Sequence, residues 1–176
     1  ENPDSQAIAS LYNNIGLVLM NENNLDGALV EFRKAIALQE WLAPNSLDIA
    51  TSHYNTGLLL VKRKHKDGAL VEYRKAVAIQ ERLAPQDPAT AASHYHLAAL
   101  LARRNDPENA LRHYRDAKAI HEKLAPNSLA IAAISCGIGS VLKGTNDLDG
   151  ALCQYRQALK IRETLVPDTL EVIRHR

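Results

Sequence analysis

The stretch ALVEYRKAVAIQERLAP, residues 69–85, decides the fold, because residues 28–44 read almost the same, ALVEFRKAIALQEWLAP. The two copies lie 41 residues apart. The same spacing separates four prolines and four alanines: Pro44, Pro85, Pro126, Pro167, Ala28, Ala69, Ala110 and Ala151. Self-similarity at a fixed period of this length is the signature of a repeat protein. The 176-residue chain is therefore predicted to hold four copies of a 41-residue unit.

Each copy is predicted to be a pair of helices, so the fold class is all-α. The first helix, of about sixteen residues, follows a capping residue at Ser5, Ser46, Asp87 or Ser128. The second follows Asn24, His65, Asp106 or Asp147 and ends before each Leu-Ala-Pro, because proline cannot continue a helix. The expected repeats are 5–45, 46–86, 87–127 and 128–168 in a single array. Residues 169–176 restart the pattern, and we expect them to begin a further first helix.

Small and aromatic residues recur at fixed places in every copy. Gly16, Gly57, Ala98 and Gly139 share one position of the first helix. Small residues let two helix backbones approach closely. The aromatic residue of the second helix, Phe32 or Tyr73, is expected to fill the space between successive units. Stability should then come from contacts between neighbouring repeats.

These residues resemble the tetratricopeptide repeat, which has an aromatic and a small residue in its first helix and alanine, aromatic, alanine in its second. Here the matching residues are Tyr12, Gly16, Ala28, Phe32 and Ala35. That repeat usually spans about 34 residues, and HEAT and armadillo units of about 40 residues lack this spacing. The longer unit here looks like the kinesin-light-chain variety. The resemblance covers almost the whole chain and implies a right-handed superhelical solenoid.

The resemblance also implies a function, since tetratricopeptide arrays hold extended peptides in a concave groove lined by the first helices. The positions carried over are Asn13, Asn14, Leu17, Tyr54, Asn55, Leu58, Lys62, Tyr95, His96, Arg103, Ser140 and Lys143. Asparagine amides pair with a peptide main chain, tyrosines offer flat contact area, and cations take carboxylates. We therefore expect an acidic or aromatic-acidic peptide. The fourth unit departs from the pattern with Cys136-Gly137, so the groove should be less engaged there.

Alternatives stay open for several of these residues. The tyrosines would also suit packing between repeats, and the amides would suit cross-linking of adjacent helices. The basic stretch 62–66 complements a helix dipole or serves as a targeting signal. Trp41 stands where other repeats have polar residues, so it is expected to be exposed, either as a protein-contact anchor or as a cover for apolar surface.

A second function class is a structural, oligomerising or sensor array within a larger protein. Such an array would make its contacts through its ends or its convex face, and end-to-end self-association of this chain would follow. Families with such repeats include cargo-binding light chains and sensor proteins with a nucleotide-switching domain.

Other classes find no support in the sequence. Lys and Arg total 21 against 20 for Asp and Glu, so no charge excess favours nucleic acid, and no apolar run is long enough to span a membrane. No catalytic motif, cofactor site or metal-ligand spacing is apparent, and His53 and His94 are expected to fill an aromatic packing slot. The two cysteines, Cys136 and Cys153, favour a reducing, cytoplasmic setting over a disulfide framework.

Overall fold

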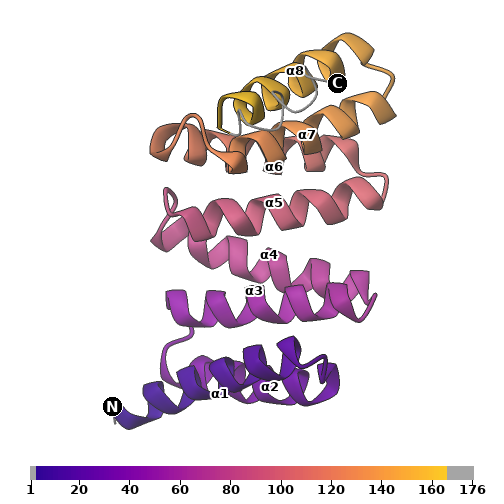
Figure 1. Ribbon diagram of the computed structural model, residues 1–176. Helices are drawn as coiled ribbons and strands as arrows, with labels where there is room; N and C mark the ends of the chain where they lie inside the picture. The colour runs from indigo at the N-terminus through magenta and orange to yellow at the C-terminus, as the bar shows by residue number, and fades with distance from the viewer. Residues whose placement is uncertain (1–2, 166–176) are drawn as a thin grey trace, which may run out of the picture. The chain divides into compact units, whose positions relative to one another are not determined.

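The computed structural model describes residues 3–165, and within that range every regular element is a helix (Figure 1). The helices are α1 (Pro3–Asn21), α2 (Leu25–Leu42), α3 (Leu47–Lys62), α4 (Lys66–Leu83), α5 (Pro88–Arg103), α6 (Pro107–Leu124), α7 (Leu129–Gly144) and α8 (Leu148–Leu165). The all-α prediction, with two helices in each 41-residue period, is confirmed. The further helix expected at residues 169–176 lies outside the described residues.

The helices begin where the capping residues predict, with one exception. Ser46 and Ser128 each accept a hydrogen bond from the backbone N–H three residues on, at 3.4 Å, and Asn24 and His65 do the same for α2 and α4. Such bonds satisfy amide groups that the first turn leaves without partners. The cap expected at Ser5 was wrong, because α1 already begins at Pro3, and proline is favoured in the first turn of a helix.

A tight turn joins the two helices of each pair, and one residue in each turn has a left-handed backbone. These residues are Asn23, Lys64, Asn105 and Asn146, with φ between 60° and 66°. The next N–H then bonds back to a carbonyl five residues earlier, as His65 does to Leu60 at 2.8 Å, which closes the helix end. Asparagine tolerates this conformation better than most side chains, so Lys64 is the poorly suited member of the set.

Lys64→Asn is therefore expected to raise the free energy of unfolding by about 1 kcal/mol, because left-handed backbone is costly for most L-residues and less so for asparagine. Thermal unfolding followed by circular dichroism would measure the gain. The reverse change at the equivalent place, Asn105→Lys, should lower stability by a similar amount. Equal melting temperatures for the wild type and both variants would contradict this account of the turn.

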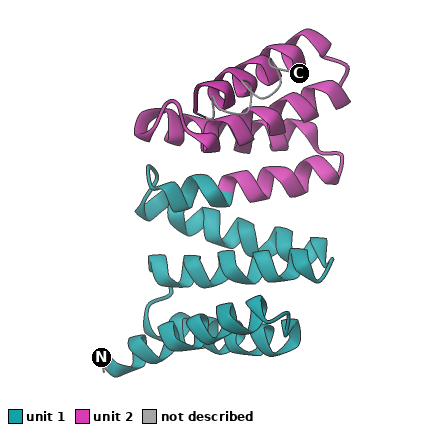
Figure 2. Ribbon diagram, viewed as in Figure 1, with its two compact units in different colours: residues 1–93 teal, residues 94–176 magenta. Residues whose placement is uncertain are grey.

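The chain divides into two compact units, residues 1–93 and 94–176, with the boundary inside α5 (Figure 2). In the first unit α1 packs on α2, α2 on α3, and α3 on α4. In the second unit α6 packs on α7, and α7 on α8. Each unit has its own core, built around Phe32 and Leu59 in the first and around Ile131 and Ile161 in the second.

The aromatic residue of the second helix lies closer to its own partner helix than the sequence suggested. A Cβ atom added at Gly16 would come within 2.5 Å of the Phe32 ring, and one at Gly57 within 2.7 Å of the Tyr73 ring. Phe32 also belongs to one core cluster with Leu59 of the next pair. The expectation of a ring between units is therefore incomplete, because the glycine opens space for the ring within the pair.

The aromatic ring of the third pair also contacts the next pair. Ala98 stands in the glycine position, and the ring of Tyr114 reaches α7, where a Cβ atom at Gly137 would lie 2.6 Å from it. This ring does lie between successive pairs, as predicted. The departure of the fourth repeat at Cys136-Gly137 thus has a packing reason, because Gly137 makes room for the tyrosine of the preceding pair.

Candidate peptide-binding site

In the first unit, two of the predicted amides bond to each other. Asn55 Nδ2 of α3 donates to Asn13 Oδ1 of α1 at 3.1 Å, and both side chains are buried. This is the cross-link between adjacent helices that the sequence left open as an alternative. The bond uses the nitrogen of one amide and the oxygen of the other. Asn13 Nδ2 and Asn55 Oδ1 take no part in this bond.

The predicted tyrosines pack against the second helix of their own pair. The ring of Tyr54 lies 5.8 Å from that of Tyr73, and the ring of Tyr95 lies 5.7 Å from that of Tyr114. Both Tyr54 and Tyr95 are half-buried, so each combines a packed side with an accessible one. Burial raises the pKa of Tyr54, and it raises the pKa of Tyr114 to about 12 with help from the charge of Tyr95. The phenols of Tyr54 and Tyr114 therefore stay protonated and can donate hydrogen bonds at neutral pH.

The basic stretch at the end of α3 contacts the preceding pair. Lys62 Nζ donates to the carbonyl oxygen of Met20 at 3.3 Å, and Arg63 pairs with Asp26 at 2.8 Å. Met20 lies in the last turn of α1, which carries no basic residue of its own. Lys62 is also in the last turn of α3, so its charge complements the dipole of α3, as expected, and that of α1 as well.

In the second unit, two of the predicted residues line one pocket. Arg103 of α5 and Ser140 of α7 face a cavity of about 210 Å³, together with Asn105, Val141 and Thr145. Gly144, which has the same place in its repeat as Lys62 and Arg103, also lines it. Lys143 is exposed one position earlier and is not among the lining residues. A guanidinium and a hydroxyl on one cavity wall suit a carboxylate-bearing ligand.

The other predicted residues vary in exposure. His96 is half-buried with its ring 5.3 Å from that of Tyr95, and burial lowers its pKa, which favours the neutral imidazole. Asn14 is exposed, and Leu17 and Leu58 are half-buried. Trp41, at the end of α2, is 78% exposed, as its polar equivalents predicted.

Sequence reasoning missed a polar contact inside each of the two middle pairs. His53 and His94 are buried, as expected for a packing slot, but each contacts a polar side chain of the partner helix. His53 Nδ1 lies 2.6 Å from Glu72 Oε2, and His94 Nδ1 lies 2.9 Å from His113 Nδ1. The signal was present, because both contacts join residues 19 apart, and Glu72 and His113 are themselves one 41-residue period apart.

The contact at Glu72 makes stability depend on pH. Burial favours the neutral acid, but the hydrogen bond and charge of His53, together with Lys75, hold the pKa of Glu72 below its usual range. A carboxyl group with a lowered folded-state pKa adds stability above its unfolded pKa and loses it as the pH falls through the folded value. Glu72→Gln should therefore cost about 1–2 kcal/mol at pH 7. The difference from the wild type should shrink below about pH 4.

Urea unfolding at pH 7 and at pH 3.5 would measure this difference. Glu122→Gln is a matched control, since Glu122 is exposed and lies 3.9 Å from Lys118, and such surface pairs contribute little. A Glu72→Gln penalty that is the same at both pH values would show that the charge of Glu72 plays no part.

Comparison with known families agrees with this architecture. The family model described as "Tetratricopeptide repeat" matches residues 7–82 and 89–164. The chain belongs to the tetratricopeptide repeat family. The second matched segment begins two 41-residue periods after the first, so each match spans two repeats. Tetratricopeptide repeats generally mediate protein–protein interaction and are typically scaffolds rather than enzymes.

Solved structures of other tetratricopeptide proteins share the fold. BtubC (BKLC) from P. vanneervenii is 20% identical with a TM-score of 0.83, and 89% of this chain aligns with 64% of that one. A putative kinesin light chain of Podosopora anserina with nearly identical TPR-like repeats is 16% identical (TM-score 0.75, covering 89% of this chain and 76% of that one). MamA is 17% identical (TM-score 0.71, covering 90% and 81%). The fold is thus shared with a protein whose repeats are of the kinesin-light-chain type.

Two further searches, one of curated proteins and one for membrane-spanning helices within the described residues, gave no match. None of the curated proteins matches the sequence of this chain. Among the helices of residues 3–165, none combines the length and the apolar character needed to cross a membrane.

Proposed function

We propose that this chain binds an extended acidic or aromatic-acidic peptide of a partner protein on the exposed sides of its first helices. The observation that supports this most strongly is the pocket of the second unit, where Arg103 and Ser140 from successive first helices line one cavity. A peptide carboxylate there would form charge-assisted hydrogen bonds with the guanidinium, which are about twice as strong as neutral ones.

The first unit offers a complementary surface for the same kind of ligand. Tyr54 is half-buried beside the bonded amides of Asn13 and Asn55, so an aromatic side chain would stack there while main-chain groups pair with the amides. Lys62 is exposed at the end of the same helix and would take an acidic residue. The cytoplasm, a reducing setting that suits the free cysteines Cys136 and Cys153, is the proposed location.

A displayed peptide library enriched in acidic and aromatic residues tests the proposal. Selected peptides would be measured by fluorescence polarisation against the wild type and Arg103→Ala, with Arg115→Ala, an exposed change on the second helix α6, as the control. Loss of a charged hydrogen bond of about 1.5–3 kcal/mol corresponds to binding weaker by about tenfold or more. If no selected peptide distinguishes Arg103→Ala from Arg115→Ala, the pocket is not the binding site.

The first unit needs its own arm in this experiment. Tyr54→Ala and Asn55→Ala should weaken the same peptides, and circular dichroism must show that both variants stay folded, because Asn55 is buried. Peptide binding that is indifferent to both changes, in folded variants, would remove the first unit from the proposal.

A second candidate function is self-association through the ends of the array. The outer side of α1 exposes four apolar residues at helical spacing, Ile8, Leu11, Ile15 and Val18. The equivalent positions of the second pair are buried. Val18 is 57% exposed, for example, whereas its equivalent Leu59 is 0% exposed. The side chains Leu152 and Leu159 of α8 are also exposed. A second copy would cover these surfaces as the next helix pair does within the chain.

Light scattering over a range of protein concentrations tests this candidate. The wild type should gain mass with concentration, Leu11→Glu should stay monomeric, and Trp41→Ala should behave as the wild type. A wild type that is monomeric at every concentration would exclude self-association of this chain.

A further inference from the structure

The four helix pairs differ in chemistry at one place between their two helices. Three positions of the repeat face this place, and they hold Tyr12, Glu31 and Lys34; His53, Glu72 and Lys75; His94, His113 and Asp116; Ser135, Gln154 and Gln157. In the first two pairs a lysine lies against a glutamate, at 2.7 Å and 3.5 Å. The third pair has histidine in place of the glutamate and aspartate in place of the lysine, so its cation is replaced by an anion.

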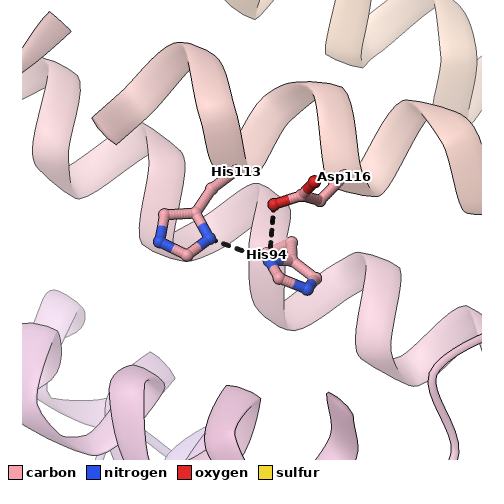
Figure 3. A group of neighbouring side chains, drawn as sticks. All are labelled: His94, His113 and Asp116. Carbon is pink, nitrogen blue, oxygen red and sulfur yellow. Dashed lines mark hydrogen bonds and ion pairs between the residues drawn. The ribbon is translucent and has the colours of Figure 1, made fainter. Parts of the chain in front are cut away.

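The three side chains of the third pair point toward one another (Figure 3). His94 comes from α5, and His113 and Asp116 lie one turn apart on α6. His94 Nδ1 lies 2.9 Å from His113 Nδ1 and 4.0 Å from Asp116 Oδ2. One ligand atom from each residue falls within 4.8 Å of the other two, and the described part of the chain holds this one such group of three. Both histidines are buried, while Asp116 is half-exposed.

Two imidazole nitrogens and a carboxylate oxygen are typical ligands of zinc and related metals. A tetrahedral zinc ion about 2.0–2.1 Å from each nitrogen places the two nitrogens about 3.3 Å apart. The present separation of 2.9 Å needs to widen by only a few tenths of an ångström. Asp116 gives solvent access, and three protein ligands leave the fourth position to water or to a group of a partner. We propose that His94, His113 and Asp116 bind a divalent transition metal ion of the zinc type.

In the metal-free state Arg112 holds His113 in a tautomer that disfavours metal binding. Its Nη2 lies 2.9 Å from His113 Nε2, and because a guanidinium only donates, that nitrogen must accept. The proton of His113 is then on Nδ1, which donates to His94 Nδ1. Metal binding at His113 Nδ1 moves the proton to Nε2 and displaces Arg112, which is 57% exposed and also pairs with Asp116 Oδ2 at 3.9 Å, so the ion would replace the guanidinium at both ligands. Removing Arg112 should therefore strengthen metal binding.

Zinc chloride titrated into the purified chain, followed by isothermal calorimetry, tests the proposal. Cys153→Ser serves as the background in all proteins, because the exposed thiol of Cys153 is itself a zinc ligand. This protein should bind one zinc ion through the site. Asp116→Lys, which copies Lys75 of the second pair, should weaken that binding at least about tenfold. Arg112→Gln should strengthen it, and magnesium, which prefers oxygen ligands, should not bind.

Cobalt gives an independent readout, because its visible absorption reports tetrahedral coordination by protein ligands. The second pair offers the reciprocal experiment, since Glu72→His combined with Lys75→Asp copies the third pair and should add a second cobalt or zinc ion per chain. The proposal is overturned if Asp116→Lys, shown to be folded by circular dichroism, binds zinc as tightly as the background protein. It is also overturned if the background protein binds no zinc.

Discussion

Phe32→Ala is expected to lower the free energy of unfolding by about 3–5 kcal/mol, the usual cost of removing a buried aromatic ring. The Phe32 side chain is fully buried, lies against the backbone of Gly16, and shares a cluster with Met20 and with Leu59 of the next pair. Its loss would leave a cavity both inside one pair and between two pairs. A domain of this size has a total stability of only about 5–15 kcal/mol, so the first unit should be severely weakened.

Urea unfolding followed by circular dichroism measures this loss, and Tyr155→Ala is the matched control. Tyr155 has the same place in the fourth repeat but is 37% exposed, and its ring lies farther from the glycine, at 3.0 Å from a Cβ atom at Gly139. Its removal should cost far less. Equal losses of unfolding free energy for the two variants would mean that the contribution of the ring to stability does not depend on its burial between repeats.

Gly57→Ala is expected to cost about 1–3 kcal/mol, although alanine normally favours a helix over glycine. The added Cβ atom would come within 2.7 Å of the Tyr73 ring, which is fully buried and has little room to move. In the third pair, Ala98 has the place of Gly57.

Gly144→Ala is the control for this change, because nothing lies within 4 Å of a Cβ atom at the end of α7. That variant should be neutral or slightly more stable. Thermal unfolding of both would decide the matter, and a Gly57→Ala protein as stable as the wild type would show that the ring moves freely.

The regular features of the fold could be predicted from the sequence because they depend on local chemistry. Ser46 and Asp106 mark helix starts through their own hydrogen bonds. Pro85 marks the end of α4, which stops at Leu83. Two features could not be predicted in this way. The first helix begins before Ser5, and Gly137 of α7 is the residue that the Tyr114 ring of α6 contacts. The contact between Tyr114 and Gly137 depends on residues in two different helices.

The candidate site was harder to predict, for a physical reason. A repeat register identifies which positions correspond, but it does not say which side of a half-buried side chain is accessible. Asn13 of α1 and Asn55 of α3 were expected to face a peptide or to cross-link adjacent helices, and they bond to each other. Arg103 and Ser140 line one cavity, while Lys143 lies one position out of register with Lys62. The contact between His94 and His113 depends on a pairing of helices that no single-helix pattern reveals.

The place where three side chains meet between the helices of each pair has a consequence for protein engineering. The same backbone carries an aromatic ring with an ion pair, a histidine with a carboxylate, a histidine pair with an aspartate, or a serine with two amides. The recurring alanines and aromatic rings pack around this place in every pair, so the fold tolerates four different sets of side chains there. Each helix pair of a designed array can therefore be given its own chemistry by substituting these three residues.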